Sequence, residues 1–173
     1  MERFCGGVAQ AFDVLFERHA RAVHAYLTRV TASRVVAEDL TQATFLSVVR
    51  SRGRFQRAVQ FRPWLYAIAT NAARDYFRRG RREHLTEKGE LPIDAPALDD
   101  PPSDTILERA VRAALEQIPA QQREVIILNR FEGLSMAEVA VAVGASEAAV
   151  KVRAHRGYER LRQLLGEAWE ENR

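Results

Sequence analysis

Residues 84–103 carry four of the chain's six prolines and contain no aromatic residue. Proline interrupts helices and sheet ladders, and no apolar side chain recurs here at a helical or strand period. The stretch therefore predicts a linker rather than part of a core. Because it divides a chain of 173 residues, each side has to bury a core of its own. We expect one domain at 1–83, the linker at 84–103 and a second domain at 104–173.

The charges are segregated along the chain. Residues 1–82 hold 15 arginines and 6 acids, residues 83–108 hold 8 acids and one lysine, and residues 109–173 hold 10 bases and 9 acids. A basic first part suits a polyanionic partner such as nucleic acid. Arginine makes up 24 of the 26 basic residues, which favours bidentate contacts to phosphates and base edges. A GC-rich genome would produce the same bias.

Several classes of protein are excluded by composition. With 47% apolar and 28% charged residues, the chain is typical of a globular protein. It has no apolar run that could span a bilayer and no readable secretory signal, so we expect a cytoplasmic protein without stable membrane insertion. The single Cys5 and the scattered histidines match no metal-binding spacing, and no nucleophile–base pair or phosphate-binding glycine loop is present. We expect no catalytic residue, metal or cofactor.

The apolar periodicity of the first part predicts three or four helices. One covers 11–30, and a second runs from a cap at Ser33 to about Arg52, where Gly53 ends it. A third has Pro63 in its first turn and continues to about Arg82. The inward positions expected on the second helix are Val36, Leu40, Thr44 and Val48. Those expected on the third are Leu65, Ile68, Ala69, Ala72 and Tyr76.

The second part is also predicted to be helical, which makes the fold all-α. A helix capped by Ser103 or Asp104 stops before Pro119, and another covers 121–131 up to Gly133.

The strongest local pattern is a predicted helix-turn-helix. Ser135 and Glu138 have the spacing of a capping box, Gly144 ends that helix, and Ser146 caps the next one. The second helix has an outward face that can enter a DNA groove. The candidate DNA-binding residues at this helix are Ser146, Glu147, Ala148, Lys151, Val152, Arg153, His155, Arg156 and Arg160. The alternative is a helical hairpin with a solvated basic face.

Two further sets of motifs resemble a known family. Residues 37–46 (AEDLTQATFL) and 61–79 (FRPWLYAIATNAARDYFRR) resemble region 2 of bacterial RNA polymerase sigma factors of the extracytoplasmic-function type. Region 4 of the same family is resembled by residues 115–119 (LEQIP), 123–125 (REV), 132–135 (EGLS) with Glu138, and Val150-Lys151 with Arg153 and His155-Arg156. The resemblance covers about Phe12 to Leu165, with the motifs in the family's order.

This resemblance implies a sigma factor that directs core RNA polymerase to promoter DNA. The second helix would dock on the β′ clamp through Asp39, Leu40, Gln42 and Phe45. The −10 element would be bound and melted by Arg54, Arg57, Phe61, Asn71, Arg74, Asp75 and Arg78. The candidate residues of the helix-turn-helix would read the −35 element. The β flap and an anti-sigma factor are further implied partners, and the acidic linker would thread through the polymerase.

For several of these residues the physical alternatives stay open. Glu38 and Asp39 could be first-turn acids that favour the positive end of their helix. Phe55, Phe61, Trp64 and Tyr66 could be core residues, and packing is the preferred interpretation for Phe55 and Trp64. The linker could be a solvated tether. As a whole, the chain could be a stand-alone helix-turn-helix regulator.

The sequence also departs from the family pattern. Ala43 stands where the family usually has glutamate, and Ala148-Ala149-Val150 replaces the common Gly-Thr-Val. Val152 stands where serine is frequent. Because positions 148 and 152 would face DNA, we expect a promoter preference that differs from the family's commonest one.

Overall fold

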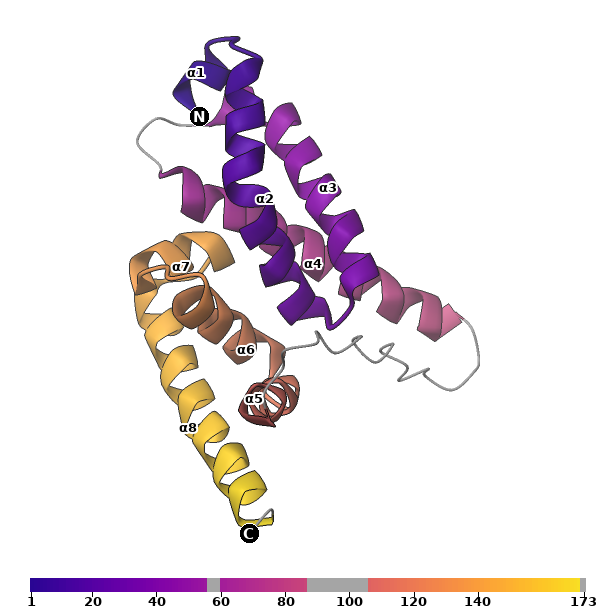
Figure 1. Ribbon diagram of the computed structural model, residues 1–173, viewed down its shortest axis with the longest axis vertical. Coiled ribbons are helices and arrows are strands. Elements are labelled where there is room, and N and C mark those ends of the chain that lie inside the picture. The colour runs from indigo at the N-terminus through magenta and orange to yellow at the C-terminus, as the bar shows by residue number, and fades with distance from the viewer. Residues whose placement is uncertain (56–59, 87–105, 172–173) are drawn as a thin grey trace. The chain divides into compact units, whose positions relative to one another are not determined.

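The computed structural model describes residues 1–55, 60–86 and 106–171, and these residues form helices and turns without a strand (Figure 1). The expected all-α fold class is confirmed. Contacts divide the chain into two units, Met1–Ala97 and Leu98–Arg173. The cap expected at Ser103 or Asp104 lies outside the described residues, as does most of the range interpreted as a linker.

The first unit has five helical elements among its described residues. They are α1 (Glu2–Cys5), α2 (Gln10–Thr31), α3 (Arg34–Arg50), the 3-10 turn η1 (Arg52–Arg54) and α4 (Phe61–Thr86). The side chain of Ser33 caps α3, because its Oγ accepts a hydrogen bond of 3.3 Å from the backbone N–H of Val36. α3 ends at Arg50 rather than near Gly53, which lies within η1. α4 continues to Thr86, beyond the expected end at Arg82.

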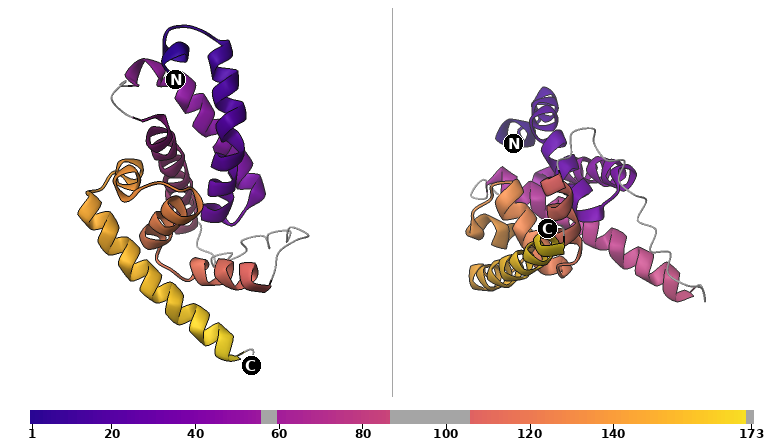
Figure 2. Two further views of the ribbon diagram at one scale, coloured as in Figure 1. Left: turned by 60° about the vertical axis from the view of Figure 1, so that its left-hand side comes forward. Right: turned by 60° about the horizontal axis from the view of Figure 1, so that its bottom comes forward.

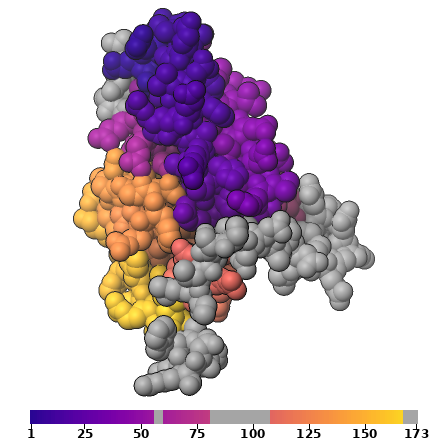
Figure 3. Space-filling model, in the orientation of Figure 1, coloured from indigo at the N-terminus to yellow at the C-terminus, as the bar shows by residue number. Residues whose placement is uncertain are grey.

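The core of the first unit lies between α2, α3 and α4. α2 and α3 lie side by side and pack on α4 (Figure 1), and their side chains form a continuous surface on the face seen in Figure 3. Val23, Tyr26 and Leu27 of α2 are fully buried there. The Tyr26 hydroxyl forms a buried hydrogen bond of 2.8 Å with Oγ1 of Thr70, so the one polar atom that α2 places in this core is satisfied.

The buried face of α4 differs in part from the expected one. Tyr66, Thr70 and Ala73 are buried beside Leu65 and Ala69, whereas Ile68 and Ala72 are half-buried. Tyr76 was expected to face inward and is 42% exposed. The expectation for Tyr76 was wrong because the apolar stripe of α4 continues past the part of the helix that α2 and α3 cover.

The second unit consists of α5 (Ile106–Glu116), α6 (Ala120–Ile126), a π-helical turn η2 (Ile127–Phe131), α7 (Met136–Val143) and α8 (Glu147–Glu171). The helix predicted at 121–131 is therefore α6 followed directly by a π turn. Asn129 stabilises the exit from this turn, because its Nδ2 donates a hydrogen bond of 2.7 Å to the carbonyl of Leu134. The Tyr158 hydroxyl of α8 donates to Oδ1 of Asn129 at 3.4 Å. The second contact joins residues 29 apart in the sequence, so it gives no local sequence signal.

α8 is held by the other three helices of the second unit. α5, α6 and α7 all contact α8 (Figure 2), and a core of Leu115, Ile118 and Ile126 lies against the C-terminal half of α8. The closest approach is at Gly157, where an added Cβ would lie 2.8 Å from Cδ1 of Ile126 and 3.2 Å from Cβ of Gln122. A larger residue at this crossing would require the Ile126 side chain to move and would press on Cβ of Gln122.

We expect Gly157→Ala to destabilise the protein by about 1–3 kcal/mol, because the added methyl group overpacks a buried crossing. Gly166→Ala is the matched control. Gly166 lies on the same helix, with no atom within 4 Å of an added Cβ, so the change should be neutral or stabilising by up to about 1 kcal/mol through helix propensity. Urea unfolding followed by circular dichroism measures both. Equal unfolding free energies for the two variants would contradict this account of the crossing.

Candidate nucleic-acid interface

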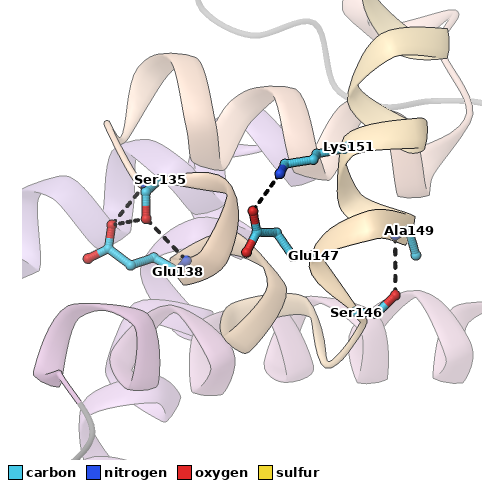
Figure 4. Close-up of polar contacts among 6 residues, drawn as sticks. All are labelled: Ser135, Glu138, Ser146, Glu147, Ala149 and Lys151. Carbon is cyan, nitrogen blue, oxygen red and sulfur yellow. Dashed lines mark hydrogen bonds and ion pairs between the residues drawn. The ribbon is translucent and has the colours of Figure 1, made fainter.

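The turn between α7 and α8 is fixed by local hydrogen bonds (Figure 4). Ser135 Oγ accepts from the N–H of Glu138 at 3.3 Å, and the Glu138 carboxylate accepts from the N–H of Ser135 at 2.8 Å. This is the expected capping box. Gly144 ends α7 in the left-handed conformation with φ of 69°. Ser146 Oγ then accepts from the N–H of Ala149 at 3.2 Å, so the predicted start of α8 is confirmed.

The N-terminal half of α8 has one buried and one exposed face. Val150, Ala154 and Gly157 are buried, and Val150 packs in the unit's core with no exposed surface. Arg153 is half-buried. The other candidate residues of this helix are exposed, namely Ser146, Glu147, Ala148, Lys151, Val152, His155, Arg156 and Arg160. The structure therefore brings eight of the nine −35 candidates together on accessible surface.

Two exposed side chains of this face are paired with acids one turn away. Lys151 Nζ lies 2.7 Å from Oε1 of Glu147 (Figure 4), and His155 Nε2 lies 3.4 Å from Oε1 of Glu159. Glu159 was not among the predicted residues, although its spacing of four from His155 was visible in the sequence. Between residues 147 and 162 there are five bases and two acids, so the face keeps a positive balance that suits phosphates.

On α4, the candidate residues lie opposite the buried stripe. Asn71, Arg74 and Arg78 are exposed, and Asp75 is half-buried. Nη2 of Arg78 lies 2.9 Å from Oδ1 of Asp75, which fixes the orientation of the two side chains relative to each other. An exposed amide at Asn71 with arginines one turn away can combine a base-edge contact with phosphate contacts.

An aromatic cluster lies at the start of α4. The Phe55 ring lies 5.1 Å from Trp64 and 6.3 Å from Phe61, and Phe61 lies 5.2 Å from His19 of α2. All four side chains are half-buried, so they pack on one another and still reach solvent. Burial, and after it the charges of nearby arginines and the N-terminus, lower the pKa of His19. A neutral imidazole is thus favoured against Phe61. Tyr66, for which core packing was the alternative, is a core residue.

Near this cluster, Arg54 is exposed within η1, whereas Arg57 lies outside the described residues. The arginine-bearing stretch before α4 is therefore placed only in part.

The outer face of α3 carries a different set of residues from the predicted one. Asp39 and Gln42 are exposed and Leu40 is half-buried, but Phe45 is 2% exposed. The ring of Phe45 packs 4.8 Å from Phe16 and 6.3 Å from Phe12, so it belongs to the core and holds α3 against α2. The alternative role for Glu38 and Asp39 as first-turn acids is wrong, because α3 begins at Arg34 and its first turn contains no acid.

Three exposed apolar residues were missed on α3. Val35 is 73% exposed, Leu46 is 55% exposed, and Val49 is also exposed. With Asp39 and Gln42 they form what we call the α3 stripe, namely Val35, Asp39, Gln42, Leu46 and Val49. Its spacing of four, three, four and three residues is that of a coiled-coil seam. That spacing was the sequence signal that could have found them.

Other kinds of site are not seen in the described part of the chain. No helix there is long and apolar enough to cross a membrane. Among the same residues, no group of three or more histidine, cysteine or acidic side chains is arranged to hold a metal ion.

Both units match known protein families. Residues 15–83 match Sigma-70 region 2, and residues 108–161 match Sigma-70, region 4. The chain is 46% identical over 168 residues to the RNA polymerase sigma factor CarQ of Myxococcus xanthus, covering 96% of each protein. It is 34% identical to the ECF RNA polymerase sigma factor BldN of Streptomyces coelicolor, covering 95% of this chain and 64% of BldN.

A solved structure shows the same fold. The sigma factor RpoE of Bartonella quintana, crystallised in complex with the anti-sigma factor NepR, superposes with a TM-score of 0.82 at 25% identity. The match covers 91% of this chain and 98% of RpoE.

Regions 2 and 4 together place the chain in the sigma-70 class of initiation factors. Within that class it belongs to the extracytoplasmic-function (ECF) RNA polymerase sigma factors. Its function is promoter-specific initiation of transcription with RNA polymerase.

Proposed function

We propose that three exposed surfaces of this sigma factor divide the work of initiation. The α3 stripe docks on core polymerase, the α4 face with the aromatic cluster captures and melts the −10 element, and the exposed face of α8 reads the −35 element. The observation that carries this assignment is that each surface lies opposite a buried stripe of its own helix. Packing therefore keeps these side chains at the surface of their helices.

The α3 stripe supports docking on a helical partner such as the β′ clamp coiled coil. Asp39 and Gln42 lie between Val35 on one side and Leu46 and Val49 on the other, and they offer a carboxylate acceptor and an amide. An exposed seam with heptad spacing packs well against another helix. Phe45 contributes by holding α3 in place, because its ring is buried against α2. Leu40, half-buried, lies at the edge of this surface.

The α4 surface supports strand opening. Phe61 and Trp64 form a partly exposed aromatic surface on which an unstacked base can lie. Asn71, two turns further along α4, can hydrogen-bond a base edge. Arg74 and Arg78 are exposed nearby and can hold the phosphates of the opened strand. We assign Arg54 and Arg57 to the same strand from their place before α4.

Chemistry and regulation belong to partners in this proposal. The chain supplies DNA recognition without a catalytic residue or cofactor, and the polymerase catalyses RNA synthesis in the cytoplasm. We further propose that the second unit contacts the β flap and that an anti-sigma factor holds the chain inactive, as NepR is bound to RpoE in the related structure. The domain limits 1–83 and 104–173 are retained as the functional division.

The docking assignment predicts that Leu46→Ala weakens binding to core polymerase by about fivefold or more, because it truncates the largest apolar side chain of the α3 stripe. Asp39→Ala combined with Gln42→Ala should also weaken it. Titration of the labelled full chain with core polymerase measures the affinity. The control is Val14→Ala, an equally exposed apolar residue on α2, which should change nothing. Unaltered affinity in all variants would reject the assignment and show that another surface of the chain binds core polymerase.

The melting assignment predicts that Asn71→Ala reduces open-complex formation on duplex promoters more than on templates with a premelted bubble. The reason is that base capture helps to offset the cost of opening the duplex. Arg74→Ala, which removes a phosphate contact, should reduce binding on both templates alike. Permanganate footprinting of unpaired thymines gives the readout. An equal loss on both templates for Asn71→Ala would show that this side chain does not capture a base.

A further inference from the structure

The exposed face of α8 has an apolar centre. Val152 is 49% exposed, and Ala148, four residues earlier, is exposed on the same face of the helix. A β-branched residue half open to water on a charged helix has no role in the core, since the buried face is formed by Val150, Ala154 and Gly157.

The polar side chains on either side of Val152 contact acidic side chains of the same helix. The Lys151 ammonium lies against the Glu147 carboxylate at 2.7 Å, and the His155 ring lies 3.4 Å from the Glu159 carboxylate. Exposed pairs of this kind are weak, and they still compete with hydrogen bonds to base edges. Val152 lies between the two pairs along the helix and needs no partner to be released before it touches DNA.

The surroundings favour DNA over a protein as the occupant of this patch. Two small apolar side chains offer little area for a protein interface, and the exposed Arg156 and Arg160 add positive charge on the following turns. In the major groove the 5-methyl group of thymine is the one apolar group on a base edge, and apolar side chains read it by direct contact.

We propose that Val152, with Ala148 beside it, selects thymine in the −35 element through the thymine 5-methyl group. The inference rests on the proposed role of α8 in −35 recognition and adds the chemical group that is read. Lys151 and the arginines then supply general attraction to the backbone, and the apolar pair supplies discrimination at its position.

The test replaces thymine by deoxyuridine, which removes only the methyl group. The holoenzyme, made from the full chain and core polymerase, first selects a promoter from a pool randomised over the −35 element. Each thymine of the selected element is then replaced in turn. For the unaltered chain, one replacement should weaken promoter binding by about three- to tenfold, the effect of losing one buried methyl contact. In Val152→Ala the same replacement should cost less than twofold.

Two variants serve as controls. Val152→Thr keeps a methyl group at the contact and should keep the penalty for deoxyuridine. Val141→Ala makes the same truncation at an apolar residue of α7 that is 52% exposed, and it should leave the penalty unchanged.

The possible failures can be told apart. An equal penalty in the unaltered chain and in Val152→Ala, or no penalty at any −35 thymine, overturns the inference while promoter selection stands. Weaker binding of Val152→Ala to core polymerase, with unchanged thymine dependence, also overturns it and identifies a protein contact. A holoenzyme that selects no −35 sequence overturns the proposed role of α8 and this inference with it.

Discussion

The crossing of α8 over α6 is the contact on which the second unit depends. Gly157 lets the two helices approach until an added Cβ would meet Ile126 at 2.8 Å, and Val150 and Ala154 continue the buried face toward the turn. Because one side of α8 is fixed in this way, its opposite side presents Ala148, Lys151 and Val152 in a set orientation. The capping box of α7 and the left-handed Gly144 then determine where α8 begins.

In the first unit, too, burial of one face of a helix sets the orientation of its exposed face. Phe45 packs against Phe16 of α2, and Thr70 of α4 is hydrogen-bonded to the buried Tyr26 of α2, so α3 and α4 are both held against α2. One face carries the α3 stripe, and the other carries the amide of Asn71 with Arg74 and Arg78. The proposed assignment gives the first face to core polymerase and the second to promoter DNA.

Features set by local chemistry were predictable from the sequence, and features set by tertiary contacts were not. Ser33, Ser135, Gly144 and Ser146 act within a few residues of themselves, and their predicted roles are confirmed. The hydrogen bond that Asn129 of the π turn accepts from Tyr158 joins residues 29 apart. Likewise, Phe45 is buried because α2 packs against it. Tyr76 is exposed because it lies beyond the part of α4 on which α2 and α3 pack. At the candidate site, the residue types, the heptad spacing of the α3 stripe and the spacing of His155 from Glu159 were visible in the sequence, whereas the face of each helix that stays exposed required the fold.

The central claim is that one chain reads two promoter elements on behalf of core polymerase. Transcription in vitro on a library of genomic fragments, with 5′ ends mapped, tests it most directly. The account predicts transcripts that require both the chain and core polymerase, starting downstream of two shared sequence motifs at nearly constant spacing. Transcripts that core polymerase makes equally well without the chain, or start sites that share one motif only, would contradict it.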